Sequence, residues 1–151
     1  MVKINHFMDS WMSHRKALLE LIDTFENEHL NYRPWDKAMT LSELVLHISS
    51  STGMFVESVK NGVFAPPSTP KMPETTEELK QLVEKETQQT KRNLEELTES
   101  QLNQIVEFSG MKMPGMALLE SAKDHEIHHK GQVFTYARLI GIENLPFFIS
   151  R

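Results

Sequence analysis

The sequence contains no cysteine among its 151 residues. This absence excludes disulfide bonds, zinc sites with cysteine ligands and cysteine nucleophiles. Positive charge is also scarce, because 16 lysines and arginines face 21 aspartates and glutamates, for a net charge of −5. We therefore expect no nucleic-acid partner, since neutralising phosphates requires a basic surface.

Long apolar runs are missing as well. No stretch approaches the roughly 18 consecutive apolar residues that a membrane-spanning helix needs, so we expect no membrane partner. The first residues, Met1–His6, turn polar within a few positions and lack the apolar region of a signal peptide. These features predict a cytoplasmic protein. The length and the hydrophobic content of 39% predict one globular domain over residues 1–151.

What the sequence does contain is helical periodicity, with apolar residues recurring at spacings of three and four. The second periodic segment opens with Thr40 and Glu43, which form the pattern of a capping box. The stripe of the third is interrupted by Glu86, Thr90 and Asn93, which indicates a partly solvent-exposed helix. The four predicted helices are Ile4–Glu28, a helix capped by Thr40 and ending at Asn61, one opening at Thr75 or Thr76, and one running from about Met116 to Ile140.

Two long connections separate these helices. Val63–Pro73 holds four prolines and is predicted to be an irregular crossover. Within the connection Glu99–Gly115, the alternation over Gln104–Phe108 is compatible with a short strand. We expect the two phenylalanines of the tail, Asn144–Phe148, to pack back on the helices. The sequence thus predicts an all-α four-helix bundle whose long crossover connections allow a non-sequential order of neighbours.

Two histidines of the last helix lie on one face. At 100° per residue, His125 and His129 are about 40° apart, within the stripe that faces the core. Such an i, i+4 pair can bring two nitrogens to a single ion. Buried polar rings without partners cost about 1–3 kcal/mol each, and a shared metal would supply both partners. His128 lies on the other side of the stripe, and its spacing also allows an inward orientation.

A catalytic metal usually has three protein ligands and one open position. The best third candidate is His47, at the edge of the stripe of the second helix, where a side chain can reach a neighbouring helix. His14 lies near the stripe of the first helix and is a weaker candidate. For His14 and His29 we expect ordinary hydrogen-bonded histidines.

The segment His125–His129 also matches the H-E-x-x-H pattern of zinc metalloproteases, in which Glu126 would be the general base. The longer pattern of one such class requires glycine at the third position after the second histidine, where this sequence has Gln132. This difference counts against a metalloprotease. Glu126 is still the one candidate catalytic residue that the sequence offers, and it or Asp124 could instead orient a ligand imidazole.

Three local motifs resemble the DinB-like superfamily, which includes the YfiT-type proteins. The first is Tyr32-Arg33-Pro34 followed by Thr40–Ile48, the second is His125–Gln132, and the third is Tyr136–Gly141. They occur in the order and at the separation found in that superfamily. The middle of the chain, Pro66–Gly115, resembles it only in the layout of its helices.

The resemblance implies a four-helix bundle with a divalent metal held by His47, His125 and His129. It also implies a homodimer. Family members with an assigned activity include thiol-dependent transferases and isomerases that use bacillithiol, mycothiol or glutathione, and others are described as metal-dependent hydrolases.

Three functional hypotheses follow. A divalent ion held by three neutral imidazoles keeps its charge and acidifies a bound water or thiol. We expect a small-molecule enzyme, with transfer of a low-molecular-weight thiol first and hydrolysis second. The third hypothesis is a non-catalytic, stress-linked metal-binding and dimerisation module. Three imidazoles suit zinc, nickel, iron and copper alike, and among these we expect zinc or nickel, with iron as a further option. The apolar pair Ile127 and Phe134, opposite the core stripe, is either a dimer contact or is buried by neighbouring elements.

Overall fold

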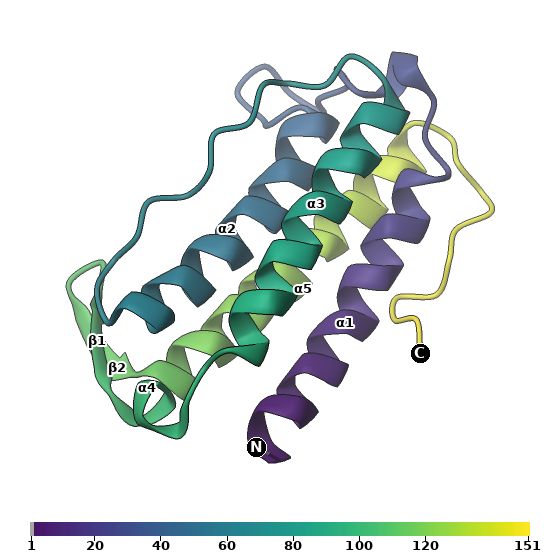
Figure 1. Cartoon of the computed structure of the whole chain (residues 1–151). Helices are drawn as coiled ribbons and strands as arrows, with labels where there is room; N and C mark the ends of the chain where they lie inside the picture. The colour runs from purple at the N-terminus through teal and green to yellow at the C-terminus, as the bar shows by residue number, and fades with distance from the viewer. Residues whose placement is uncertain (1) are drawn as a thin grey trace.

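Four long helices run side by side in the computed structural model, which describes residues 2–151 and leaves Met1 outside (Figure 1). The mostly helical fold predicted from the sequence is confirmed. None of the helices formed by residues 2–151 combines the length and hydrophobicity needed to cross a bilayer. The elements in chain order are α1 (Val2–Ile22), the 3-10 helix η1 (Asn27–His29), α2 (Leu41–Asn61), α3 (Thr76–Glu95), α4 (Glu99–Asn103), β1 (Ile105–Phe108), β2 (Met111–Pro114) and α5 (Gly115–Leu139).

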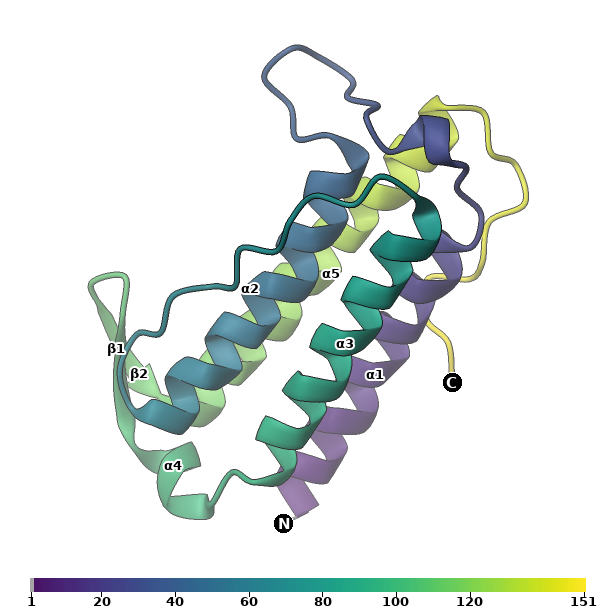
Figure 2. The same ribbon diagram turned by 45° about the horizontal axis from the view of Figure 1, so that its top comes forward.

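The helices do not pack in sequence order. Helix α1 packs against α3 and α5, and α2 packs against the same two helices, so the consecutive helices α1 and α2 lie diagonally across the bundle. Figure 2 shows the crossover between α2 and α3 running back along α2, so that α3 starts at the same end of the bundle as α2. Helices α2 and α3 are therefore parallel neighbours, an arrangement that requires a long connection.

The ends of α2 follow from its sequence. Thr40 Oγ1 accepts a hydrogen bond from the Glu43 amide at 3.1 Å, and the Glu43 carboxylate accepts one from the Thr40 amide at 2.9 Å. This is the predicted capping box. The helix stops at Gly62, whose φ of 77° suits glycine and few other residues.

Helix α1 ends at Ile22 and not at Glu28 as predicted. The amides of Thr24 and Phe25 bond to carbonyls three residues earlier, at 3.0 and 3.1 Å, which tightens the chain and terminates the α-helix. Phe25 nevertheless stays buried. The spacing of apolar residues thus continues through the turn, which is why the sequence pattern overestimated the length of the helix.

The connection from Glu99 to Gly115 holds more structure than predicted. The predicted strand is present as β1, and it pairs with β2 in an antiparallel hairpin through Ser109 and Gly110, whose φ values are 50° and 79°. Positive φ at both positions is typical of the tightest hairpin turns. Strand β2 is Met-Lys-Met-Pro, which alternates over only three residues and is mostly exposed, so its sequence gave too short a signal.

The tail returns along the bundle as expected, but its two phenylalanines do not pack against it. Phe147 and Phe148 are 68% and 55% exposed, so the prediction that they pack back is wrong. The tail is attached through Ser150, whose amide bonds to the Ser13 carbonyl at 2.8 Å, and through the Phe148 carbonyl, which accepts a hydrogen bond from Lys130 Nζ. Polar backbone contacts therefore replace the expected aromatic packing.

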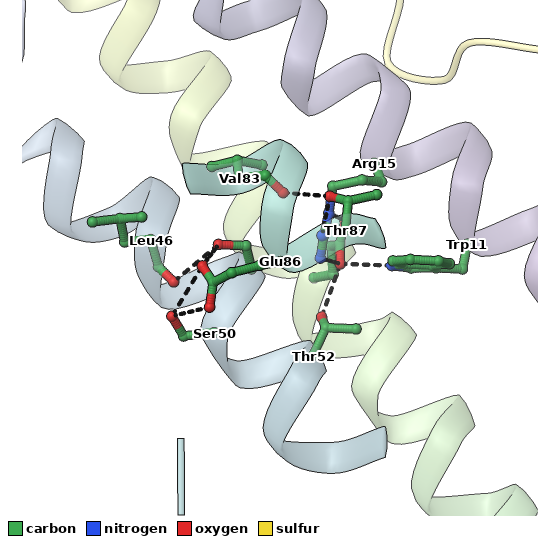
Figure 3. Close-up of polar contacts among 10 residues, drawn as sticks. Trp11, Arg15, Leu46, Ser50, Thr52, Val83, Glu86 and Thr87 are labelled. Carbon is green, nitrogen blue, oxygen red and sulfur yellow. Dashed lines mark hydrogen bonds and ion pairs between the residues drawn. The ribbon is translucent and has the colours of Figure 1, made fainter. Parts of the chain in front are cut away.

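A buried polar layer joins all four long helices. Arg15 of α1 donates from Nε and Nη2 to the two carboxylate oxygens of Glu126 in α5, at 2.9 and 2.7 Å. Thr52 of α2 donates to Glu126 at 2.8 Å, Trp11 Nε1 donates to it at 3.0 Å, and Arg15 Nη1 donates to Thr87 of α3 at 2.8 Å. Figure 3 shows Trp11 and Arg15 of α1, Thr52 of α2 and Thr87 of α3 reaching the interior.

This layer divides the core into two apolar clusters. Burial alone would raise the pKa of Glu126, but the Arg15 guanidinium and the hydrogen bonds from Arg15, Thr52 and Trp11 outweigh burial and hold that pKa below its ordinary value. Glu126 is therefore a carboxylate at neutral pH. The cluster on one side includes Leu18, Ile48, Val83 and Val133, and the cluster on the other side includes Phe7, Val56, Leu94 and Leu119.

Removing one partner of this ion pair should destabilise the fold strongly. We expect Glu126→Ala to lower the free energy of unfolding by about 3–5 kcal/mol, because it leaves the Arg15 charge buried without a partner. The double variant Arg15→Met/Glu126→Leu should lose much less, since it buries no charge. Urea unfolding of the two proteins measures the difference, and equal losses would contradict the assignment.

The ion pair also makes stability depend on acid. A carboxyl group whose pKa is lowered on folding stabilises the protein above its unfolded pKa, and this contribution is lost as the pH falls through the folded pKa. We expect the free energy of unfolding to drop below about pH 4.3, the ordinary glutamate value. The decline should be shallower in the Arg15→Met/Glu126→Leu variant, and identical slopes would argue against this contribution.

Candidate metal centre

Three histidines converge between α2 and α5. The ligand nitrogens of His47, His125 and His129 all lie within 4.8 Å of one another. The ring centroids of His125 and His129 are 4.4 Å apart, and those of His47 lie 5.0 and 4.8 Å from them. The structure thus brings together the three residues that the sequence predicted as ligands, while the binding of a metal stays a prediction.

The position of these rings follows from the helices that hold them. Helices α2 and α5 pack closely along their length, and His47 lies at the edge of α2 that faces α5. On α5, the spacing of four residues places His125 and His129 one turn apart on that side. Glu126 points into the core toward Arg15, which fixes the rotation of α5 and directs both histidines toward His47.

The environment favours the neutral form of two of these imidazoles, His125 and His47. Burial, followed by the neighbouring His129, His47 and His128, lowers the pKa of His125 to about 4. Burial and the neighbouring His129 also lower the pKa of His47. Neutral rings have free lone pairs, and a divalent cation requires this form of histidine.

The hydrogen bonds around the rings also fit a cation. His129 Nδ1 lies 2.7 Å from Gln132 Oε1, so the proton is on Nδ1 and Nε2 keeps its lone pair. His47 Nδ1 lies 3.4 Å from Ser51 Oγ. His125 Nδ1 is buried without a hydrogen-bond partner among residues 2–151. Three imidazoles, one with an unsatisfied nitrogen, are a donor set that suits a divalent transition metal.

The remaining histidines have other partners. His14 Nδ1 lies 2.8 Å from Lys130 Nζ, and His29 Nδ1 accepts a hydrogen bond from the Glu26 amide at 3.0 Å, so both are hydrogen-bonded as expected. His29 forms a second close group with Glu26 and Glu28, but that group is largely exposed and its histidine nitrogen is already used. His128 is exposed beside His129 and lies outside the three-histidine group.

Glu126 does not face the histidines. Both of its oxygens accept hydrogen bonds from α1 or α2, and its side chain is fully buried. It therefore has no free oxygen with which to act as the general base or to orient a ligand ring, and the other candidate, Asp124, is exposed. Sequence reasoning missed the partner Arg15, although an arginine on the apolar stripe between Trp11 and Leu18 was a signal of a buried charge.

A cavity of about 450 Å³ opens beside the site, between α2 and the crossover. His47 and Ser51 lie on its wall, together with Met39, Met54 and Met72. On the other side, the Phe55 ring lies 5.9 Å from His125 and stacks on Phe108 of β1 at 4.8 Å. The group of histidines therefore adjoins, through His47, a largely apolar space that a small molecule can enter.

The proposed apolar dimer contact is not formed by the pair predicted for it. Phe134 belongs to the core and is only 7% exposed, whereas Ile127 is partly exposed. For Phe134, the alternative of burial by neighbouring elements is therefore correct. The homodimer implied by the sequence resemblance stays a prediction.

Comparisons with known proteins agree with the fold. The model of the DinB family matches residues 1–150. The chain is 38% identical, over an alignment of 154 positions, to the uncharacterized protein YjoA of Bacillus subtilis (strain 168), which covers 100% of this chain and 99% of YjoA. It is 22% identical to the uncharacterized protein YrdA of the same organism, over 92% of this chain and 84% of YrdA.

Solved structures give the same result. A crystal structure of the DinB-like protein YjoA from Bacillus subtilis superposes with a TM-score of 0.86 at 34% identity, over 97% of this chain and 99% of that one. A DinB-like protein from Bacillus cereus ATCC 10987 superposes with a TM-score of 0.80 at 21% identity, over 93% and 94% of the two chains. At that lower identity the second likeness supports the fold alone.

The neutral state of the site can be measured directly. In metal-free protein we expect the His125 ring to titrate with a midpoint near pH 4, because burial and the adjacent rings oppose its protonation. Ring-proton NMR spectra recorded over a pH series give the midpoint, and the signal missing from His125→Asn assigns it. A midpoint near 6.5, the value of an exposed histidine, would contradict the described environment.

Proposed function

This chain belongs to the DinB family, and from that premise we propose that it is a divalent-metal-dependent enzyme that transfers a low-molecular-weight thiol to a small electrophilic molecule. One observation carries the proposal. Three imidazoles from two helices converge, and one of them, His47, lines an open, largely apolar cavity. We propose zinc or nickel as the metal, with iron as a further option.

Each residue of the site has a distinct task in this proposal. His47, His125 and His129 would hold the ion, while Gln132 fixes the tautomer and orientation of the His129 ring. When bound, a divalent ion at this position would lower the pKa of a coordinated thiol or water toward neutrality. The apolar walls exclude bulk water from the reacting groups, which strengthens electrostatic interactions there.

The surrounding carboxylates favour thiol transfer over hydrolysis. Glu126 is fully engaged in the core. Glu43, which lines the cavity, accepts a hydrogen bond from the Thr40 amide and lies 3.7 Å from the Arg33 guanidinium. Glu126 therefore cannot remove a proton from water, and Oε1 of Glu43 is engaged at the start of α2. A thiol is far more acidic than water and needs no such base.

The reaction is balanced without any further reactant. The thiol of a bacillithiol- or glutathione-type molecule loses its proton to solvent, and its sulfur forms a bond to the electrophilic carbon. The leaving group departs with the electron pair of the broken bond. Because the chain has no cysteine, the sulfur must come from the small thiol. The methionines of the cavity would contact the apolar part of the electrophile.

Two alternatives remain as competing proposals. A hydrolase would use the same ligands with an activated water, and a non-catalytic module would bind the metal without turnover. The homodimer is likewise part of the proposal, and sedimentation at micromolar concentration distinguishes it from a monomer.

Metal binding is the first test. We expect untagged protein to contain roughly one divalent ion per chain by inductively coupled plasma mass spectrometry. His129→Ala should lose the ion, because two imidazoles rarely hold it. His128→Ala removes the exposed histidine next to it and should keep the ion. Wild-type protein that stays empty after incubation with zinc or nickel would overturn the metal site.

Activity is the second test. With glutathione or bacillithiol and chlorodinitrobenzene, we expect formation of the thioether and release of chloride. Turnover should require the metal, should be lost in His129→Ala and should persist in His128→Ala. Hydrolysis of activated esters without thiol would favour the hydrolase, and metal binding without either turnover would favour the non-catalytic module.

A further inference from the structure

A second and larger cavity, of about 700 Å³, lies over the seam between the parallel helices α2 and α3. The crossover forms its roof, and Figure 2 shows this segment running back along α2 to the start of α3. None of the three histidines lines it. Residues of α2 lie opposite residues of α3 along this seam, and their sequence numbers differ by a nearly constant amount. The pairs are Ser50 with Glu86, Gly53 with Thr90, and Glu57 with Asn93.

Two carboxylates on the wall of this cavity have no cationic partner. None of the ion pairs formed by residues 2–151 involves Glu57 or Glu86. Glu86 accepts hydrogen bonds from the hydroxyls of Ser49, Ser50 and Ser68 at 2.6–3.3 Å, and Figure 3 shows Ser50 beside it. Neutral hydroxyls satisfy the lone pairs of Glu86 but leave its charge uncompensated.

Glu57 also has no cationic partner among residues 2–151. Its carboxylate accepts a hydrogen bond from Asn93 Nδ2 at 3.0 Å, and Asn93 Oδ1 in turn accepts one from Lys60 Nζ at 3.2 Å. Both carboxylates are half-buried, so solvent screens them only in part. The seam therefore presents two negative charges that are free to attract a cation.

A buried hydroxyl lies between the two carboxylates. Thr90 is only 1% exposed, lines the cavity, and has no side-chain hydrogen bond to any of residues 2–151. Its Oγ1 points across the seam to Gly53, where a Cβ atom would lie 3.5 Å away. Because position 53 has no side chain, the floor of the cavity stays open at this hydroxyl.

The spacing of these groups defines the shape of a ligand. Glu86 is hydrogen-bonded to Ser50, and Glu57 lies two helical turns beyond Ser50 on α2. The distance between these two positions along the helix axis is about 10 Å. The hydroxyl of Thr90 is between these levels. Above them are apolar groups, Met54 and the prolines of the crossover. Lys85 and Arg92 are exposed at the rim.

We propose that this seam is a binding site for a linear aliphatic diamine, with an ammonium group at each carboxylate and the methylene chain beneath the prolines. An ammonium group carries three donors and no acceptor, so it can satisfy a carboxylate and the Thr90 hydroxyl together. Methylene groups between the two charges match the apolar roof. The site does not depend on the histidines, and its occupation is independent of the proposed thiol transfer.

The test is an amide NMR titration of the full-length chain with cadaverine. We expect saturable shifts at Gly53, Glu57, Glu86 and Thr90. Pentylamine, which has one ammonium, should bind at least about tenfold more weakly, and pentanediol, which has none, should not saturate.

Two variants distinguish binding at this site from a general attraction of cations to a negatively charged protein. Glu57→Gln keeps the size of the side chain and an oxygen for Asn93, and we expect it to weaken cadaverine binding at least about tenfold. Glu84→Gln removes the same charge from an exposed position of α3 and should bind as the wild type does. Equal binding by these two variants would overturn the proposal.

A second pair of variants separates an effect on cadaverine binding from an effect on stability. Gly53→Ala places a methyl group in the open floor and should weaken binding, although alanine favours the helix and raises thermal stability. Gly131→Ala, inside α5 with no atom within 4 Å of the new methyl, should raise stability and leave binding unchanged. Absence of saturable shifts in wild-type protein, or unchanged binding in Gly53→Ala, would refute the site.

Discussion

The buried pair between Arg15 and Glu126 is the interaction on which the arrangement of this bundle depends. Apolar clusters above and below it can slide or rotate at modest cost, because hydrophobic contacts have no direction. A bidentate guanidinium–carboxylate pair has a fixed geometry, and two charges removed from water cannot accept a poor one. Thr52 and Thr87 extend the same constraint to the other two long helices. The pair thus selects one rotation and one height for each helix.

The histidine site is a consequence of that selection. Adjacent residues on a helix point about 100° apart, so the inward direction of Glu126 determines the direction of His125. The same rotation places His129 one turn further along, opposite His47. Burial lowers the pKa of His125 and of His47, and His47 lines the neighbouring cavity. A buried charge in the core therefore sets the direction of a group of nitrogen donors between α2 and α5.

Much of this could be predicted from the sequence wherever the cause is local. The Thr40 cap, the stop at Gly62 and the shared face of His125 and His129 depend on residues within a few positions of each other. The failures have long-range causes. Glu126 was interpreted through its neighbours in a motif, whereas its partner is 111 residues away. The end of α1 was missed because Phe25 stays buried beyond the helix, and β2 was missed because its pairing with β1, and not its own pattern, makes it a strand. His47 was proposed from its place at the edge of the stripe of the second helix, and the resemblance implied the same residue.

The crossover links the two cavities through the topology of the bundle. Parallel helices α2 and α3 can be neighbours only if the chain returns along their whole length. The returning segment contains four prolines, which lack amide donors, so it needs few backbone partners. Its hydrogen bonds to the helices are correspondingly few. Ser68 Oγ donates to Glu86 at 2.6 Å and to Ser50 Oγ at 3.2 Å, and the Ala65 amide donates to Ser58 Oγ at 2.9 Å. Such a segment covers the helices without filling the grooves beneath it. Ser50, Met54 and residues 67–70 line both cavities, so the same segment of the crossover forms part of the wall of each cavity. The order of helices that places His47 beside α5 therefore also creates the space above Gly53 and Thr90.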